Sequence, residues 1–134
     1  MLHFAASKKD LEAKRLVRVK VGRIPFVVVR ARQGPRAYLA VCPHKDIAFG
    51  AKLAGGAIEC PIHEIRFDTG DGRVRDARGR DLTEGLTPAE VIVDGDDVLV
   101  DVTTDHAERF KRAVRGRRAS KLGRMLASPW KLSR

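Results

Sequence analysis

The sequence has only two cysteines and no long run of apolar residues. No segment reaches the ~18 apolar residues that a membrane-spanning helix needs, and residues 1–7 are too short for the apolar core of a secretory signal. Two cysteines without such a signal do not indicate a protein stabilised by disulfides. We therefore expect a soluble protein of the cytoplasm.

Aromatic residues are scarce, with one Trp and one Tyr. The formal net charge is +10, which would favour a polyanionic partner such as nucleic acid. However, the sequence contains no recognisable nucleic-acid-binding motif and few aromatic side chains on which bases could stack. The composition therefore argues against nucleic acid as the partner.

Both cysteines are followed by a histidine within three residues. The segment 41–68 contains C-P-H from Cys42 to His44 and C-P-I-H from Cys60 to His63, with fifteen residues between the two motifs. Thiolate and imidazole are soft to borderline ligands, and four of them on two short loops indicate a metal or cluster site. The residues alone leave two assignments open, one zinc ion or a [2Fe-2S] cluster. A disulfide, or two buried structural cysteines, would leave the matched histidines unexplained.

The two loops resemble those of the Rieske [2Fe-2S] domain in its small ferredoxin form. That form has C-P-H in the first loop and C-P-x-H in the second, followed by R-F-D, which occurs here at 66–68. The resemblance implies a [2Fe-2S] cluster with Cys42 and Cys60 on an inner iron. It also implies that His44 and His63 bind an outer iron near the surface, where electrons enter and leave.

The loops depart from those of the Rieske proteins in cytochrome bc complexes. Those proteins carry an extra cysteine in each loop, where this chain has Ile47 and Ile62, and hydroxyl residues where this chain has Ile65 and Phe67. Because hydrogen bonds to the cluster stabilise its reduced form, their loss predicts a reduction potential at the low end of the Rieske range. Glu64 replaces a usual glycine, which requires backbone angles that a side chain tolerates and predicts a subtly different second loop.

The resemblance implies a one-electron carrier that takes electrons from a reductase and passes them to a terminal oxygenase or hydroxylase. Such a carrier is an electron-transfer component and needs no catalytic residues of its own. Only His3 and His106 lie outside the two loops, too few for the mononuclear iron site of an oxygenase catalytic subunit. Two alternatives stay open: a small Rieske subunit of a multi-subunit oxidoreductase such as nitrite reductase, and a zinc-stabilised interaction module.

Short apolar segments separated by turns indicate an all-β, antiparallel domain, into which the two ligand loops insert a small subdomain. Ser7 is a helix cap that predicts a helical turn through about Ala13. The alternating segment 16–21 predicts a half-buried strand, and the sequence D-G-D at 94–96 predicts a hairpin turn. The Rieske resemblance covers approximately residues 7–102 and agrees with this pattern.

The end of the chain differs from everything before it. Residues 105–134 contain ten Lys and Arg and two acids, a net charge of +8, so we expect a Rieske domain over 1–104 and a separate basic tail. Asp105 and Glu108 predict a helix start and Pro129 its end. Three interpretations of the tail stay open: a solvated, partly disordered extension, a docking arm for an acidic partner protein, or a helix on an anionic membrane surface.

Overall fold

The computed structural model describes residues 1–43, 47–48, 50–61 and 64–127 of the 134-residue chain. An antiparallel sheet forms its centre, and its strands are β2 (Leu16–Val21), β3 (Ile24–Ala31), β4 (Gly34–Leu39) and β11 (Pro88–Ala89). Their spatial order is β11-β4-β3-β2. The predicted strand at 16–21 is confirmed as β2.

One face of the central sheet packs against the layer formed by the two ends of the domain. The layer contains β1 (Leu2–Ser7), α1 (Lys8–Lys14), β12 (Val91–Asp94) and β13 (Asp97–Asp101), and its sheet order is β1-β13-β12. The predicted cap at Ser7 is confirmed, because its hydroxyl accepts a hydrogen bond from the Asp10 N–H at 3.1 Å. The predicted hairpin is also confirmed, with Asp94 paired to Asp97 across a two-residue turn.

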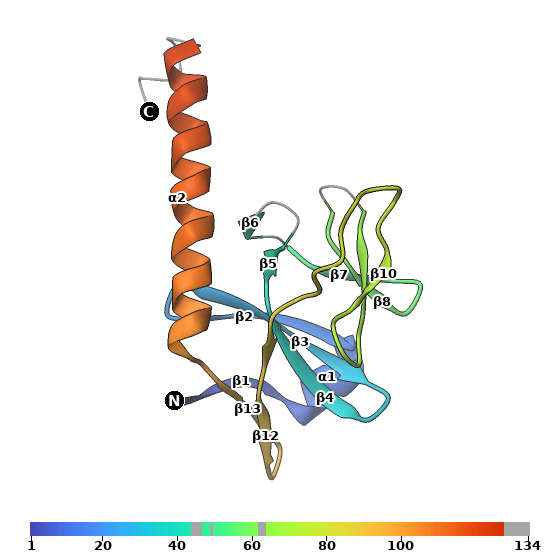
Figure 1. Cartoon of the computed structure of the whole chain (residues 1–134). Helices are drawn as coiled ribbons and strands as arrows, with labels where there is room; N and C mark the ends of the chain where they lie inside the picture. The colour runs from blue at the N-terminus through green and yellow to red at the C-terminus, as the bar shows by residue number, and fades with distance from the viewer. Residues whose placement is uncertain (44–46, 49, 62–63, 128–134) are drawn as a thin grey trace.

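The predicted subdomain is inserted between β4 and β11. It consists of a short hairpin, β5 (Val41–Cys42) with β6 (Ile47–Ala48), and of a sheet of β7 (Lys52–Ala54), β8 (Ala57–Glu59), β9 (Arg66–Asp68) and β10 (Val74–Asp76). All the pairings within it are antiparallel. Figure 1 shows both parts at the end of the domain opposite to the β12–β13 hairpin. The all-β, antiparallel fold is therefore confirmed.

Strand β3 separates two hydrophobic cores. Because successive side chains of a strand point to opposite faces, Val27 and Val29 lie in one core, and Phe26 and Val28 lie in the other. All four side chains are almost completely buried. The core that contains Val27 also contains both cysteines of the chain, so we call it the cysteine-side core; the other core lies against β1 and β13.

A long helix, α2 (Thr104–Ala127), follows β13 and confirms the predicted C-terminal helix. Its start differs from the prediction: the Thr103 hydroxyl, not Asp105, caps it by accepting from the His106 N–H at 3.3 Å. Its first turns pack onto the domain through His106 and Ala113, both buried, and its last turns extend beyond the sheets (Figure 1).

No helix in the described ranges is long and apolar enough to cross a membrane. The division at residue 104 stays a prediction.

Candidate functional site

The first ligand loop begins at the end of β5. Val41 pairs with Ala48, and Cys42 pairs with Ile47, so a β-hairpin closes the loop at its base. Cys42 is 2 % exposed and packs in the cysteine-side core. The hairpin therefore fixes the backbone of Cys42 directly under the loop. His44, the predicted ligand from this loop, lies outside the described residues.

The second ligand loop begins directly after β8. The Cys60 N–H donates to the Ile65 carbonyl at 2.9 Å, and the Glu64 N–H donates to the Cys60 carbonyl at 2.8 Å. These bonds close the loop at its base, as the β5–β6 pairing closes the first. Cys60 is completely buried in the same core as Cys42. His63, the predicted ligand from this loop, also lies outside the described residues.

Glu64 adopts a left-handed backbone conformation with a φ of 59°. Glycine adopts this conformation without penalty, whereas a residue with a Cβ pays about 1–2 kcal/mol. The expectation that position 64 has backbone angles favourable to a side chain is therefore wrong, and Glu64 keeps the geometry that glycine favours. Arg78 supports it, because its Nε donates to the Glu64 carbonyl at 3.3 Å.

The surroundings of the two cysteines are apolar. Ile65 and Phe67, the residues at the hydroxyl positions of bc-type Rieske proteins, are completely buried beside them in the cysteine-side core. The remaining buried members of this core are Val27, Val29, Tyr38, Ala51, Ile58 and Leu86. Neither Ile65 nor Phe67 can donate a side-chain hydrogen bond to a sulfur atom.

A buried carboxylate adjoins Cys60 in the sequence. Glu59 has a side chain only 6 % exposed, and it pairs with Lys52 and Arg66, each at 3.4 Å. Lys52 and Arg66 are its direct partners on β7 and β9, so the three side chains form a row across the sheet. Sequence reasoning missed this row, because only the strand register shows that residues seven positions apart face each other.

Tyr38 anchors the turn that follows β9 to the central sheet. Its hydroxyl donates to the Thr69 carbonyl at 2.8 Å. Burial, reinforced by the nearby carboxylate of Asp71, raises the pKa of Tyr38 to about 12. The phenol is therefore neutral and able to donate throughout the physiological pH range.

The segment between β10 and β11 covers the subdomain. Leu86 is buried in the cysteine-side core and Leu82 packs against it. The Leu86 N–H donates to the Gly72 carbonyl at 2.9 Å. Gly85 allows this close approach, since a Cβ on it would lie 2.5 Å from the Gly72 carbonyl oxygen.

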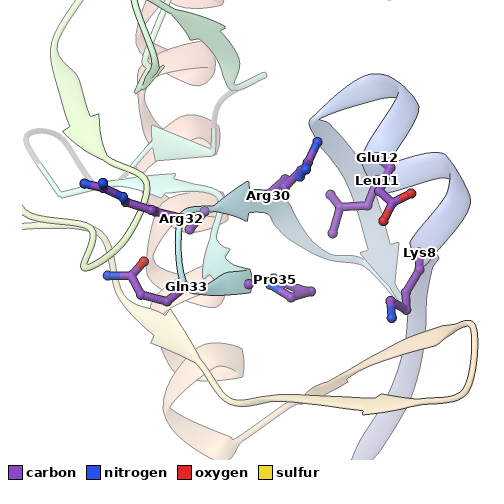
Figure 2. A pocket seen from close by; sticks show the side chains of 9 residues that line it. Lys8, Leu11, Glu12, Arg30, Arg32, Gln33 and Pro35 are labelled. Atoms are coloured by element: carbon purple, nitrogen blue, oxygen red, sulfur yellow. The ribbon is translucent and has the colours of Figure 1, made fainter.

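A cavity of about 390 Å³ lies away from the cysteines, between α1 and the turn that joins β3 to β4. Its charged lining residues are Lys8, Glu12, Arg30 and Arg32. Their side chains point in different directions and do not converge on one position (Figure 2). This cavity therefore offers no alternative metal or cluster site.

The donor set fits a metal cluster. Two buried thiols stand at the bases of adjacent loops in one apolar core, which shields charged thiolate ligands from water. The described residues alone contain no group of three or more metal-ligating side chains, so ligation by these thiols needs further ligands from elsewhere in the chain. The two predicted histidines follow the cysteines in the sequence by two and three positions.

Comparison with solved structures supports the same fold. The ferredoxin of carbazole 1,9a-dioxygenase from Nocardioides aromaticivorans IC177 is similar, with 24 % identity and a TM-score of 0.61 over 77 % of this chain and 99 % of that chain. The cyanobacterial plasma membrane Rieske protein PetC3 from Synechocystis PCC 6803 has 24 % identity and a TM-score of 0.63 over 75 % and 99 %. A chain from the complex of reduced oxygenase and oxidized ferredoxin in carbazole 1,9a-dioxygenase has 27 % identity and a TM-score of 0.60 over 74 % and 91 %.

No curated protein sequence matches the chain. The family model of the Rieske [2Fe-2S] domain, in contrast, matches residues 2–101, which is most of the sequence and includes both ligand loops. The matched range also includes every strand of the fold and excludes α2. The chain therefore belongs to the Rieske [2Fe-2S] domain family.

Proposed function

We propose that this protein is a one-electron carrier that passes electrons from a reductase to a terminal oxygenase or hydroxylase. A Rieske domain implies a [2Fe-2S] cluster, which supplies a one-electron couple when bound. The proposed ligands are Cys42, His44, Cys60 and His63. The observation that carries the proposal is that both cysteines of the chain are buried in one core, each at the base of a short closed loop.

The residues around the loops have positioning roles in this proposal. The two cysteines hold their sulfur atoms inside the fold, away from water. The proposed histidine ligands follow the cysteines by two and three positions, and a neutral imidazole ligand has a second ring nitrogen that can face water or a partner. Arg78 holds the backbone of the second loop through the Glu64 carbonyl. No residue of this chain is assigned a catalytic role.

The reduction potential is expected to be low. Ile65 and Phe67 are completely buried and have no hydroxyl group to stabilise a reduced cluster. A redox titration of the reconstituted protein should give a midpoint at the ferredoxin-like, negative end of the Rieske range. A clearly positive midpoint would contradict this expectation.

The nature of the partners follows from the similar proteins and from charge. Similar chains include the ferredoxin of a dioxygenase and a chain from an oxygenase–ferredoxin complex, which supports an oxygenase as acceptor. The excess of basic residues favours acidic partner proteins, through faster encounter at low salt.

The alternative role, as a small Rieske subunit of a multi-subunit oxidoreductase, predicts a single stable complex on native purification, whereas a carrier should purify alone. The cytoplasmic location stays a prediction.

The decisive test is the chemistry of the cluster. Iron, zinc and acid-labile sulfide are measured on the purified protein, and an electron paramagnetic resonance spectrum is recorded after reduction. We expect two irons and two sulfides per chain and a mixed-ligand [2Fe-2S] signal, which the Cys42→Ser variant should lose. The Ala51→Ser variant, which adds a hydroxyl to the same core without removing a ligand, should keep it. Zinc without sulfide would refute the proposal in favour of an interaction module.

The role of the basic tail is tested by truncation. Deleting residues 116–134 removes six basic residues and no acid, and it keeps His106 and Ala113, the buried residues of α2. If the tail is a docking arm, the truncated protein should show a weaker salt dependence of electron transfer. An unchanged salt dependence would refute the docking arm, and loss of binding to anionic vesicles on truncation would favour the membrane-surface interpretation.

A further inference from the structure

A continuous groove runs between α2 and the edge of the central sheet formed by β2 and β3. It consists of two adjoining cavities of about 440 Å³ each, which share Arg23, Phe110 and Val114 in their linings. The first cavity extends along β2 toward Ala40 and Gly50, near the first ligand loop. The second extends along α2 to Arg115.

The floor of the groove is apolar. Phe26 and Ala113 are buried there, and the side chains of Phe110 and Val114 are half-buried along its wall. Val19 and Ile24, from β2 and β3, continue the apolar surface on the sheet side. An apolar side chain of a bound molecule could therefore be buried in the groove, which would provide favourable free energy in proportion to the area covered.

The rim of the groove carries charge of a single sign. Its charged lining residues are Arg18, Lys20, Arg23, Lys111 and Arg115, and no acidic residue in the described part of the chain lines either cavity. Among the residues that the structure describes, only Lys111 in this set has an acidic partner, Glu108 at 3.5 Å. The rim therefore presents several positive charges that the described part of the protein does not neutralise.

The groove depends on α2, which lies outside the residues matched by the family model. The helix is held in place by His106 and Ala113, and it passes beside β5 and β6, which carry the first ligand loop (Figure 1). A molecule bound in the groove would consequently lie beside that loop. This position suits the recognition of a redox partner.

We propose that the groove binds an acidic segment of a partner protein, with apolar side chains of the segment covering Phe110 and Val114 and its carboxylates facing the basic rim. This inference deepens the proposed function and rests on it, since the partner is an electron donor or acceptor. A second copy of this chain suits the groove less well as an occupant, because its own net charge is +10. The concave shape and apolar floor suit an inserted side chain better than a flat membrane surface.

The proposal is tested by fluorescence anisotropy with the full-length protein carrying its cluster. One labelled probe is a short peptide in which glutamates alternate with leucines, and its matched probe has serines in place of the leucines. We expect the leucine peptide to bind about tenfold more tightly than the serine peptide, and Arg23→Glu or Phe110→Ser to weaken it about tenfold. The exposed Lys111→Glu provides a second charge reversal that does not disturb the core.

Matched controls lie outside the groove. Lys9→Glu reverses an exposed charge on α1, and Phe4→Ser removes an exposed aromatic ring from β1, so both should leave peptide affinity unchanged. The proposal is overturned if the two peptides bind equally, if the groove variants bind the leucine peptide like the unmodified protein, or if phosphatidylglycerol vesicles compete with the peptide in a groove-dependent way. A protein that has no [2Fe-2S] signal but retains groove-dependent peptide binding would refute only the proposed electron transfer.

Discussion

The Nε2 atom of His106 lies 3.0 Å from the carbonyl oxygen of Pro88 and donates a hydrogen bond to it. The direction of this bond follows from the other ring nitrogen, because Nδ1 accepts from the Thr103 N–H at 3.0 Å and must carry a lone pair. The ring also packs against that of Phe26 in a T-shaped arrangement, with ring centroids 5.3 Å apart. One side chain thus joins the cap of α2, strand β11 and strand β3.

Replacing His106 by leucine should loosen α2. The variant loses the two part-buried hydrogen bonds to the Thr103 N–H and the Pro88 carbonyl, at a cost of about 2 kcal/mol. Urea denaturation should show this loss, whereas Glu108→Gln, which removes an exposed pair on the same helix, should change stability by less than about 0.5 kcal/mol. Equal stability of the two variants would show that the ring does not hold the helix.

Tyr38 should make the protein sensitive to alkali. Its pKa is raised from 10.0 to about 12 in the folded state, so the unfolded chain releases the proton first as the pH increases. The stability contributed by the neutral phenol is complete below pH 10 and falls as the pH rises toward 12. Tyr38 is the only tyrosine, so tyrosinate absorbance reports it alone, and Tyr38→Phe should remove the titration. Ionisation near the ordinary value in the folded protein would contradict this prediction.

Gly85 should not tolerate a side chain. A Cβ there would lie 2.5 Å from the Gly72 carbonyl oxygen, which is a backbone atom and cannot rotate away as a side chain could. Gly85→Ala should therefore destabilise the fold by about 1–3 kcal/mol. Gly95→Ala is a useful comparison, because its φ of 60° is unfavourable for alanine but no atom lies within 4 Å. We expect it to cost about 1 kcal/mol. Thermal unfolding of both variants separates steric overlap from backbone conformation, and a milder effect at position 85 would argue against the close approach.

Neutralising Glu59 should weaken the sheet beside Cys60. Glu59→Gln removes a buried charge that pairs with Lys52 and Arg66, and we expect a loss of about 1–2 kcal/mol. Glu84→Gln breaks an exposed pair with Arg109 and should cost less than about 0.5 kcal/mol. Chemical denaturation at equal salt compares the two, and the cluster spectrum shows whether the second loop is disturbed. A Glu59 variant as stable as Glu84→Gln would show that the charge row is not stabilising.

The features predicted correctly from the sequence are those that depend on local patterns. The serine cap before α1 and the D-G-D turn between β12 and β13 each need only a few neighbouring residues. The cysteine and histidine motifs were recognised in the same way, because their spacing is a property of single loops. The family model then confirmed the Rieske assignment over residues 2–101.

The features that were missed depend on contacts between distant parts of the chain. The row of Lys52, Glu59 and Arg66 exists only through the register of three strands. The spacing of Asp105 and Glu108 predicts a cap at Asp105, but the Thr103 hydroxyl accepts from the His106 N–H and caps the helix instead. The sequence T-T-D-H contains this signal, yet histidine at the third position is not the usual partner of a capping threonine.

The alternation along β3 makes stability and redox properties separable by mutation. Val28 borders the core against β1 and β13, so shortening it opens space that does not reach the cysteines. Its neighbours Val27 and Val29 border the core that holds Cys42 and Cys60, and shortening them changes the packing around the sulfur atoms. Substitutions at consecutive valines of β3 can therefore change two properties separately. Position 28 changes the stability of the fold, and positions 27 and 29 change the environment of the proposed cluster ligands.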